Sequence, residues 1–299
     1  MAQTKEGAMP DRDAAAPVEA ALEATLRDIG IPPRPAILDR IGSEMRAATP
    51  NFRQLAELIS ADVALAAGLL KTANSPYFGF ETRVRTVMQA VMMLGLDVTS
   101  RAIAGLILRR VFAPLPALER FWDSSARVAR TSGWLVTQLG IRDSVRADDA
   151  YTYGLFRDCG IPILMKKIPG YVDVLNAANR DPERAFTAIE RASCPTDHAL
   201  VGCMMAQNWW LPEETFTAIR HHHDAVALAV GPQGLRPATV RMVALAQLAE
   251  YLVQRIAGLS ATREWDKLGA TCQTILEIDG VVVESLVEEA RPVVADVLG

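Results

Sequence analysis

The apolar residues of this chain recur at intervals of three and four positions along almost its whole length. This spacing places apolar side chains on one face of an α-helix, whereas a half-buried β-strand needs strict alternation, which no stretch of strand length shows. The pattern therefore predicts an all-α protein. Two of the clearest helical faces are formed by Phe52, Leu55, Ala56 and Ile59, and by Leu65, Leu69, Leu70 and Ala73.

Prolines and glycines divide the predicted helices into two lobes. Pro114 and Pro116 interrupt the chain after five predicted helices with short loops, which together make a lobe of about 90 residues. The chain has 299 residues and is 50% hydrophobic, which is enough to bury one large core or two smaller ones. We predict an unstructured leader at residues 1–20, an N-terminal five-helix lobe at 21–115, a second helical lobe at 116–230 and a C-terminal helical extension at 231–299.

Three short polar side chains are predicted to cap helices at their N-termini. Thr49 precedes a proline, the residue favoured at the first helical position, and Asp62 and Thr196 each precede an apolar helical pattern. The side-chain oxygen of such a residue accepts a hydrogen bond from an N–H group of the first turn. These residues therefore predict where three helices begin.

Composition and charge argue against several classes of protein. The formal net charge is −4, so no basic surface for nucleic acid is expected. The four cysteines have no CxxC spacing, and the N-terminal segment lacks the apolar core of a signal peptide. No uninterrupted apolar run reaches the ~18 residues that indicate a membrane span. We expect a cytoplasmic protein with neither a membrane nor a nucleic acid as its partner.

All four histidines lie in the second predicted lobe, at His198 and in the run His221–His223. With Asp158 upstream, they form a series of carboxylate and imidazole groups that a helical bundle can point at one another, which is how such bundles build metal sites. Gly202 lies one helical turn after His198, where the missing side chain lets another helix approach. Spacing leaves two interpretations open, buried histidines held by hydrogen bonds or a metal site. It also leaves open which of the last two histidines faces the cleft.

Several motifs, taken in order, resemble the signature of the HDOD family, the HD-related output domains. An Asn-Ser-x-Tyr-x-Gly element at residues 74–79 precedes a helix ending in Leu-Gly at 94–95, and a Phe-Trp-x-x-Ser element begins at Phe121. Residues 153–160 are similar to the family's Gly-Leu-Leu-His-Asp-Ile-Gly segment. The resemblance covers about residues 30 to 225 and is completed by His198 with Gly202, by Trp210, Leu211 and Pro212, and by Ile219 with His222 and His223.

HDOD modules resemble the HD phosphohydrolases, whose metals are held by a first His, a His-Asp pair, later histidines and a late Asp. By this comparison Asp158 is the Asp of the pair, and the later histidines are His198 and either His222 or His223. The second lobe is then an HD-like lobe.

The remaining ligand positions depart from that pattern. Ser124 would stand for the first His, Arg157 for the His of the pair and Gln247 for the late Asp. A guanidinium is a permanent cation without a lone pair to donate, so Arg157 cannot ligate a metal. Too few ligands are then left to hold two ions and activate water. The resemblance therefore implies a degenerate site with no catalysis and no expected metal, in which Arg157 neutralises Asp158.

By its resemblance to HDOD modules, the chain is interpreted as a bacterial signal-transduction and regulatory protein, a pseudoenzyme that acts by binding a protein partner or a small ligand. The expected partners are signalling proteins with receiver, kinase or cyclic-di-nucleotide components, and no cofactor is expected. The alternative is a divergent metal-dependent phosphohydrolase acting on a nucleotide or phosphodiester. In that case Asp158, His198, His222 and His223 would hold a single divalent ion such as Mn or Fe.

The junction of the two lobes is the expected binding cleft, because ligand sites form preferentially at such junctions. Asn74 and Ser75 are also typical helix-terminating residues, so a C-cap and turn is the other interpretation of their loop. The residues expected to line the cleft are Asn74, Ser75, Tyr77, Arg83, Trp122 and Arg157.

Overall fold

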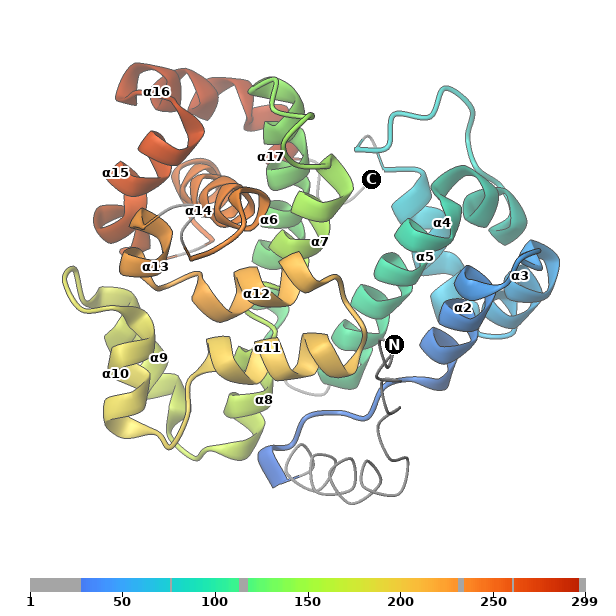
Figure 1. Ribbon diagram of the computed structural model, residues 1–299, viewed down its shortest axis with the longest axis horizontal. Coiled ribbons are helices and arrows are strands. Elements are labelled where there is room, and N and C mark those ends of the chain that lie inside the picture. Colours follow the sequence, from blue (N-terminus) through green and yellow to red (C-terminus); the bar gives the residue numbers. More distant parts are fainter. Residues whose placement is uncertain (1–27, 76, 113–117, 231–233, 260, 296–299) are drawn as a thin grey trace, which may run out of the picture.

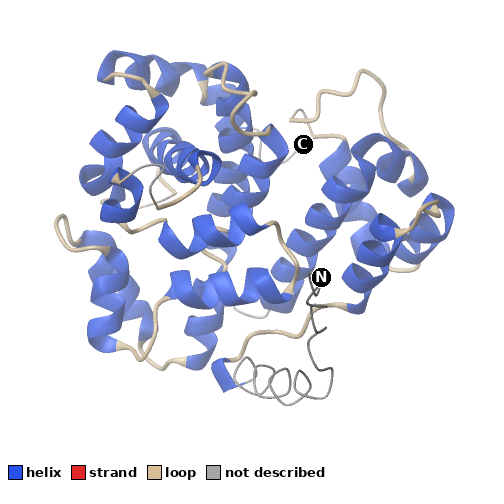
Figure 2. Cartoon of the chain, viewed as in Figure 1, coloured by secondary structure: helices blue, strands red, loops and turns tan. Residues whose placement is uncertain are grey.

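The computed structural model describes residues 28–75, 77–112, 118–230, 234–259 and 261–295. Within these ranges every regular element is a helix and there is no β-strand (Figure 2). The prediction of an all-α fold is confirmed. The leader predicted at residues 1–20 and the boundary predicted at Pro114 and Pro116 lie outside the described residues.

The N-terminal lobe, on the right in Figure 1, is a bundle in which α5 packs against α2, α3 and α4. Its helices are α2 (Ala36–Arg46), α3 (Phe52–Ser60), α4 (Val63–Ala73) and α5 (Val87–Phe112). Ile41, Ile59, Leu69 and Ile103 are fully buried at the centre of this bundle. They belong to the faces that the spacing of three and four residues predicts.

α5 is bent at Gly95, whose φ of 75° lies in the left-handed region that glycine adopts without strain. The bend falls where the sequence predicts that one helix ends and another begins. Within the described residues α5 is the one helix long and apolar enough to cross a membrane by length and composition. However, the break leaves neither part with the roughly 20 residues that a spanning helix needs. Its residues Ile103, Ile107 and Leu108 are buried, so α5 is the core helix of this lobe.

The second lobe is built around two long helices, α6 and α14, that pack against each other (Figure 1). Its helices are α6 (Glu119–Gln138), α7 (Ala147–Phe156), α8 (Gly160–Lys167), α9 (Tyr171–Arg180), α10 (Phe186–Ser193), α11 (His198–Asn208), α12 (Glu213–His221), α13 (Ala225–Ala229), α14 (Pro237–Ala257), α15 (Glu264–Leu276), α16 (Gly280–Glu289) and α17 (Arg291–Ala295). α7 packs against α6, and α11 lies beside α12. The predicted extension from residue 231 onward thus contributes α14 to the same core as α6 and α7.

The N-caps show how closely the sequence locates helix starts. Asp62 caps α4 as predicted, because its carboxylate accepts hydrogen bonds from two N–H groups of the first turn. The other two predictions were wrong by one or two residues. Asn51 caps α3 in place of Thr49, and Asp197 caps α11 in place of Thr196. In both cases a second capping side chain lies closer to the first helical turn.

Polar contacts join the two lobes. Arg101 of α5 forms ion pairs with Asp97 on its own helix and with Asp149 of α7. Elsewhere, the indole N–H of Trp209, after α11, donates to the carbonyl oxygen of Pro32, 3.2 Å away, in the segment that leads into α2. The histidine-bearing lobe is therefore held against the N-terminal bundle at both α7 and the end of α11.

Candidate metal centre

Four side chains from separate parts of the second lobe converge on one point. Asp158 lies in the turn between α7 and α8, His198 is the first residue of α11, and His222 and His223 follow α12. His198 Nε2 is 3.2 Å from the Nε2 atoms of both His222 and His223. Asp158 Oδ1 is 3.2 Å from His222 Nε2 and 3.6 Å from His198 Nε2. The three imidazole rings are buried.

Both adjacent histidines face the cluster, which the helical spacing could not decide. α12 ends at His221, and His222 is its C-cap. Beyond that point the angular spacing of helical side chains no longer separates neighbours onto different faces. His221 itself is 32% exposed and lies near Asp224, outside the cluster.

The second nitrogen of each inward ring is fixed by an acceptor. Carboxylate and carbonyl oxygens only accept, so each Nδ1 carries the proton and each Nε2 presents its lone pair to the centre. Metal-ligating histidines are almost always held in this way. The Nδ1–acceptor distances are 2.7 Å for His198 to Glu190 Oε2, 2.7 Å for His222 to the Ile219 carbonyl and 2.5 Å for His223 to Glu264 Oε2.

The two supporting glutamates are held in the charged form. Burial raises the pKa of Glu190, but the charge and hydrogen bond of His198 more than offset it, so the pKa is lowered. Burial also raises the pKa of Glu264, but His223 and Lys267 together bring it down to about 2. Both carboxylates therefore act as permanent acceptors for the rings that they orient.

The centre of the cluster attracts positive charge. Burial lowers the pKa of His198, but Glu190 and Asp158 raise it to about 10. In contrast, burial and the neighbouring His223 lower the pKa of His222 to about 3. Three inward lone pairs cannot hydrogen-bond to one another, so they need a cation between them. That cation is either a proton on His198 or a metal ion, and the two compete.

The donor set fits one small divalent ion. The four donor atoms lie within 4.8 Å of one another, and their closest separations are 3.2 Å. A tetrahedron with edges of about 3.3 Å has its centre about 2.0 Å from each corner, which is the bond length from zinc to imidazole nitrogen or carboxylate oxygen. The separations of 3.2 and 3.6 Å that join His198 to the other three donors and Asp158 to His222 are close to such edges. Three imidazoles and one carboxylate also suit Mn or Fe. The residues present could therefore hold one ion, although the sequence led us to expect none.

Arg157 holds the other oxygen of Asp158. Its Nη2 is 2.8 Å from Asp158 Oδ2 and 2.8 Å from Glu250 Oε1, and its side chain is 5% exposed. Burial lowers the pKa of Arg157, but these two carboxylates raise it well above its usual value. Burial likewise raises the pKa of Asp158, but Arg157 and the histidines hold it well below its usual range. Gln247 Nε2 donates to the His222 carbonyl oxygen over 3.4 Å. Two residues that the sequence comparison set at metal-ligand positions, Arg157 and Gln247, are thus a fixed cation and a neutral amide.

A cavity of about 370 Å³ opens onto the cluster. Asp158, His198 and His223 line it together with Arg157 and Ser124. In the same wall, the ring of Phe186 stacks on that of His223 with centroids 4.8 Å apart. The cluster is therefore buried, but one side of it adjoins a space large enough for a small ligand.

The residues expected to line the interlobe cleft are dispersed. Asn74 stabilises the loop between α4 and α5, because its side chain forms two hydrogen bonds of 2.8 Å with the backbone of Val84. Trp122 is buried in α6, and Arg157 lines the cavity beside the histidines. Ser75 lies in the turn after α4, Arg83 is exposed, and Tyr77 lines a separate and larger pocket between the lobes.

Sequence reasoning missed Glu190 and Glu264, which orient two of the rings. Glu190 carries a signal that could have been used, since it lies one turn after Phe186 on the buried face of α10. A charged residue on an apolar face needs a buried partner. Glu264 is the first residue of α15, far from the histidines in sequence, and no local pattern distinguishes it.

Comparison with known proteins identifies the family. The HDOD domain matches residues 31–225. A protein of Treponema pallidum (strain Nichols), named "Uncharacterized protein", is 26% identical over 208 residues. That match covers 69% of this chain and 40% of the relative, so the chain spans less than half of the relative's length.

Solved structures show the same fold. An HDOD domain protein with unknown function from Geobacter sulfurreducens has a TM-score of 0.63 at 21% identity, covering 94% of this chain and 99% of that one. A "Putative phosphohydrolase" from Shewanella amazonensis SB2B has a TM-score of 0.62 at 19% identity, covering 93% and 97%. A "Putative signal transduction protein" from Marinobacter aquaeolei VT8 has a TM-score of 0.63 at 21% identity, covering 95% and 65%.

At these identities the structures establish the fold and not the activity. The motifs read from the sequence, the helical architecture and the match over residues 31–225 all point to one family. This chain belongs to the HDOD family.

Proposed function

We propose that this chain is a non-catalytic signal-transduction module that acts by binding, and that its histidine cluster holds one divalent ion as part of the fold. Asp158, His198, His222 and His223 would hold that ion, which would link the α7–α8 turn to the start of α11 and the end of α12. A bound ion of this kind supplies binding energy to the folded state.

The observation that carries the proposal is the buried ion pair of Arg157 with Asp158 and Glu250. A second metal beside Asp158 would have to share that carboxylate with a guanidinium that stays protonated. The four donors also form a complete set for one ion. Catalytic zinc sites usually keep three protein ligands and leave a position for water, whereas four protein ligands are typical of structural sites.

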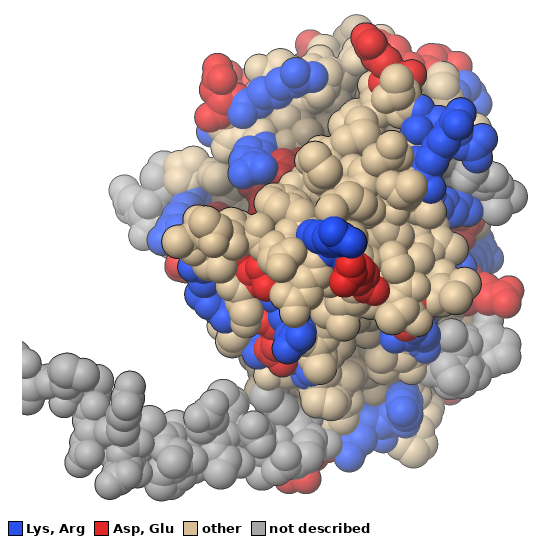
Figure 3. Space-filling model, turned by 90° about the vertical axis from the view of Figure 1, so that its right-hand side faces the viewer, with Lys and Arg blue, Asp and Glu red and all other residues tan. Residues whose placement is uncertain are grey.

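The proposed partners are signalling proteins with receiver, kinase or cyclic-di-nucleotide components, and binding would take place in the cytoplasm. Partner binding would change how the two lobes pack against each other. Acidic and basic side chains lie interspersed around a broad uncharged area on the face shown in Figure 3. This mixture supports a protein partner over a nucleic acid, which would favour a stripe of basic residues.

The test measures metal content and hydrolysis on the same preparation, purified without an affinity tag. We expect about one metal equivalent per chain and no metal-dependent turnover of bis(p-nitrophenyl) phosphate or p-nitrophenyl phosphate. His198→Ala should lose the metal, while His221→Ala is the matched control because His221 lies outside the cluster. Two equivalents of metal, or turnover that disappears in His198→Ala, would contradict the proposal.

A divergent phosphohydrolase is the second candidate, and the 370 Å³ cavity favours it. This cavity reaches Asp158, His198 and His223 and carries the guanidinium groups of Arg120 and Arg157, so an anionic ester could approach the ion. The hydrolysis assay above separates the two candidates. Partner capture adds a second criterion, since a signalling module should recover specific proteins from its host above the background of an unrelated chain.

A further inference from the structure

A second and larger pocket lies between the two lobes, away from the histidines. Its volume is about 980 Å³. The loop before α5, α5 itself, α6, the segment before α7 and α17 all contribute to its walls. Cavities of this size at the junction of two lobes are typical of small-molecule sites. We call it the interlobe pocket.

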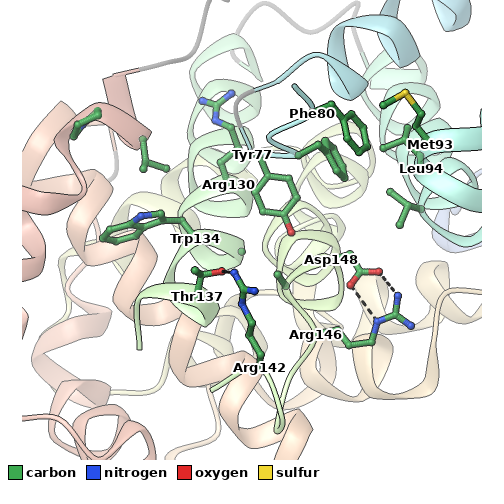
Figure 4. Close-up of a pocket in the computed structure, with 16 residues that line it drawn as sticks. Tyr77, Phe80, Met93, Leu94, Arg130, Trp134, Thr137, Arg142, Arg146 and Asp148 are labelled. Carbon is green, nitrogen blue, oxygen red and sulfur yellow. Dashed lines mark hydrogen bonds and ion pairs between the residues drawn. The ribbon is translucent and has the colours of Figure 1, made fainter. Parts of the chain in front are cut away.

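The interlobe pocket has an apolar side and a basic side. Phe80, Met93 and Leu94 line the upper right side in Figure 4, and Arg142 and Arg146 lie on the lower side beside Asp148, with the Tyr77 ring between the two groups. Arg130 also lines the pocket, at the upper left of the same view. A ligand that reached from the wall of Phe80, Met93 and Leu94 to Arg142 would therefore contact apolar side chains at one end and a guanidinium group at the other.

Arg142 supplies positive charge that no described carboxylate neutralises. Its Nη2 donates to the Thr137 hydroxyl oxygen over 3.0 Å, and it has no ion pair among the described residues. Arg146, in contrast, is paired with Asp148, whose Oδ2 is 2.7 Å from its Nη2. A phosphate or carboxylate group is the natural partner for an uncompensated guanidinium.

The aromatic wall of the pocket is built into the fold. A methyl group at Gly133 of α6 would lie 2.2 Å from Tyr77 Cε2, so only glycine lets the Tyr77 ring pack there. On its other side, Tyr77 stacks on Tyr151 of α7, with ring centroids 4.9 Å apart. The ring that divides the apolar side from the basic side is thus held by α6 and α7 together.

We propose that the interlobe pocket binds a small amphipathic organic anion, with its apolar or aromatic body against Phe80 and its anionic group at Arg142. This inference rests on one part of the proposed function, namely that the chain acts by binding a partner or ligand. The charge of Arg142 together with the apolar far side selects this chemistry over a neutral apolar ligand. Two kinds of molecule have this chemistry: a fatty acid released from lipid and a nucleoside monophosphate.

The probe is 8-anilinonaphthalene-1-sulfonate, an aromatic anion whose fluorescence rises in an apolar site. Its matched neutral analogue is N-phenyl-1-naphthylamine, which has the same rings without the sulfonate. Arg142→Gln should weaken binding of the anion by up to about fivefold, as the loss of an exposed ion pair does, and leave binding of the neutral analogue unchanged. Phe80→Ala should weaken both probes. Arg53→Gln removes the same charge from α3, outside the pocket, and should change neither.

Competition identifies the source of the ligand. Displacement of the fluorescent anion by decanoate indicates a fatty acid, and displacement by adenosine monophosphate indicates a nucleotide. The proposal is overturned if neither displaces it, if Arg142→Gln behaves like Arg53→Gln, or if the neutral probe weakens equally. These outcomes are independent of metal content and hydrolysis, so this inference and the proposed function can fail separately. Circular dichroism of each variant checks that it is folded.

Discussion

Arg157 donates through both Nε and Nη2 to the same oxygen of its neighbour Asp158, at 3.1 and 2.8 Å. The other oxygen of Asp158 belongs to the histidine cluster. One carboxylate is thus shared between a fixed cation and the histidine cluster, which is the proposed position of a metal ion. The two halves of this arrangement lead to different predictions.

Removing the guanidinium should destabilise the fold. Arg157→Met keeps much of the length of the side chain but leaves Asp158 and Glu250 buried without their common partner. Breaking a buried ion pair in this way costs about 3 kcal/mol or more of unfolding free energy. Urea titration followed by circular dichroism measures the change.

Arg291→Met is the control for this loss. Arg291 is paired with Glu288, but both side chains are more than half exposed, so this pair should contribute little. Equal losses of unfolding free energy in the two variants would show that the buried Arg157 pair stabilises the fold no more than an exposed pair does.

The sequence predicted the helical architecture because helical faces depend on local patterns, and it named Asp158 and the inward histidines through their order along the chain and the family resemblance. Helical spacing alone indicates the buried faces, and Gly202 marks a close approach that the structure confirms, with Gly160 N 3.2 Å from where its side chain would begin. What the sequence could not supply are contacts made across long separations, such as His223 with Glu264. The choice between His222 and His223 also lay beyond a periodicity argument, since both follow the end of the helix.

The orienting glutamates should control metal affinity. Glu190→Gln and Glu264→Gln keep an acceptor of the same size but remove the charge that fixes the Nδ1–H form of His198 and His223. Losing such a supporting carboxylate typically costs 10–100-fold in metal affinity, and we expect about that loss here. Competition with a chromophoric chelator measures it. Glu213→Gln, at an exposed pair with Arg236, should leave the affinity unchanged.

Without metal, stability should fall as the pH rises above neutral. The pKa of His198 is raised to about 10 in the folded protein, because Glu190 and Asp158 outweigh the opposing effect of burial, against 6.5 in an unfolded chain. A group with a raised pKa stabilises the folded state fully below its unfolded pKa, and this contribution is lost as the pH climbs toward the folded pKa.

The useful pH window runs from about 6.5 to about 8.5, below the range in which thiols titrate. His222 does not affect the stability within this window. Because its pKa is lowered in the folded protein, it destabilises the fold only at lower pH, where acid protonates the ring in the unfolded chain. Urea unfolding of chelator-treated protein should therefore show a declining free energy across the window. His198→Asn should flatten the decline and His221→Asn should not. A wild-type stability that stays constant or rises would contradict this assignment.

The close approach of α8 to α11 should be intolerant of a single methyl group. A Cβ at Gly160 would lie 2.1 Å from the carbonyl oxygen of His198 and 2.8 Å from the backbone nitrogen of Gly202. These are backbone atoms, so the two helices would have to move apart, and His198 would leave its place beside Asp158. We expect Gly160→Ala to cost about 3 kcal/mol, the upper end of what overpacking typically costs, because the atoms that it meets belong to the backbone.

Metal affinity should fall with stability in Gly160→Ala, because the same shift displaces a ligand. Gly280→Ala provides the comparison, since no atom lies within 4 Å of its added methyl group. That variant should unfold like the wild type and bind metal equally well. If Gly160→Ala folded normally and kept full metal affinity, the spacing of α8 and α11 could not be what positions His198.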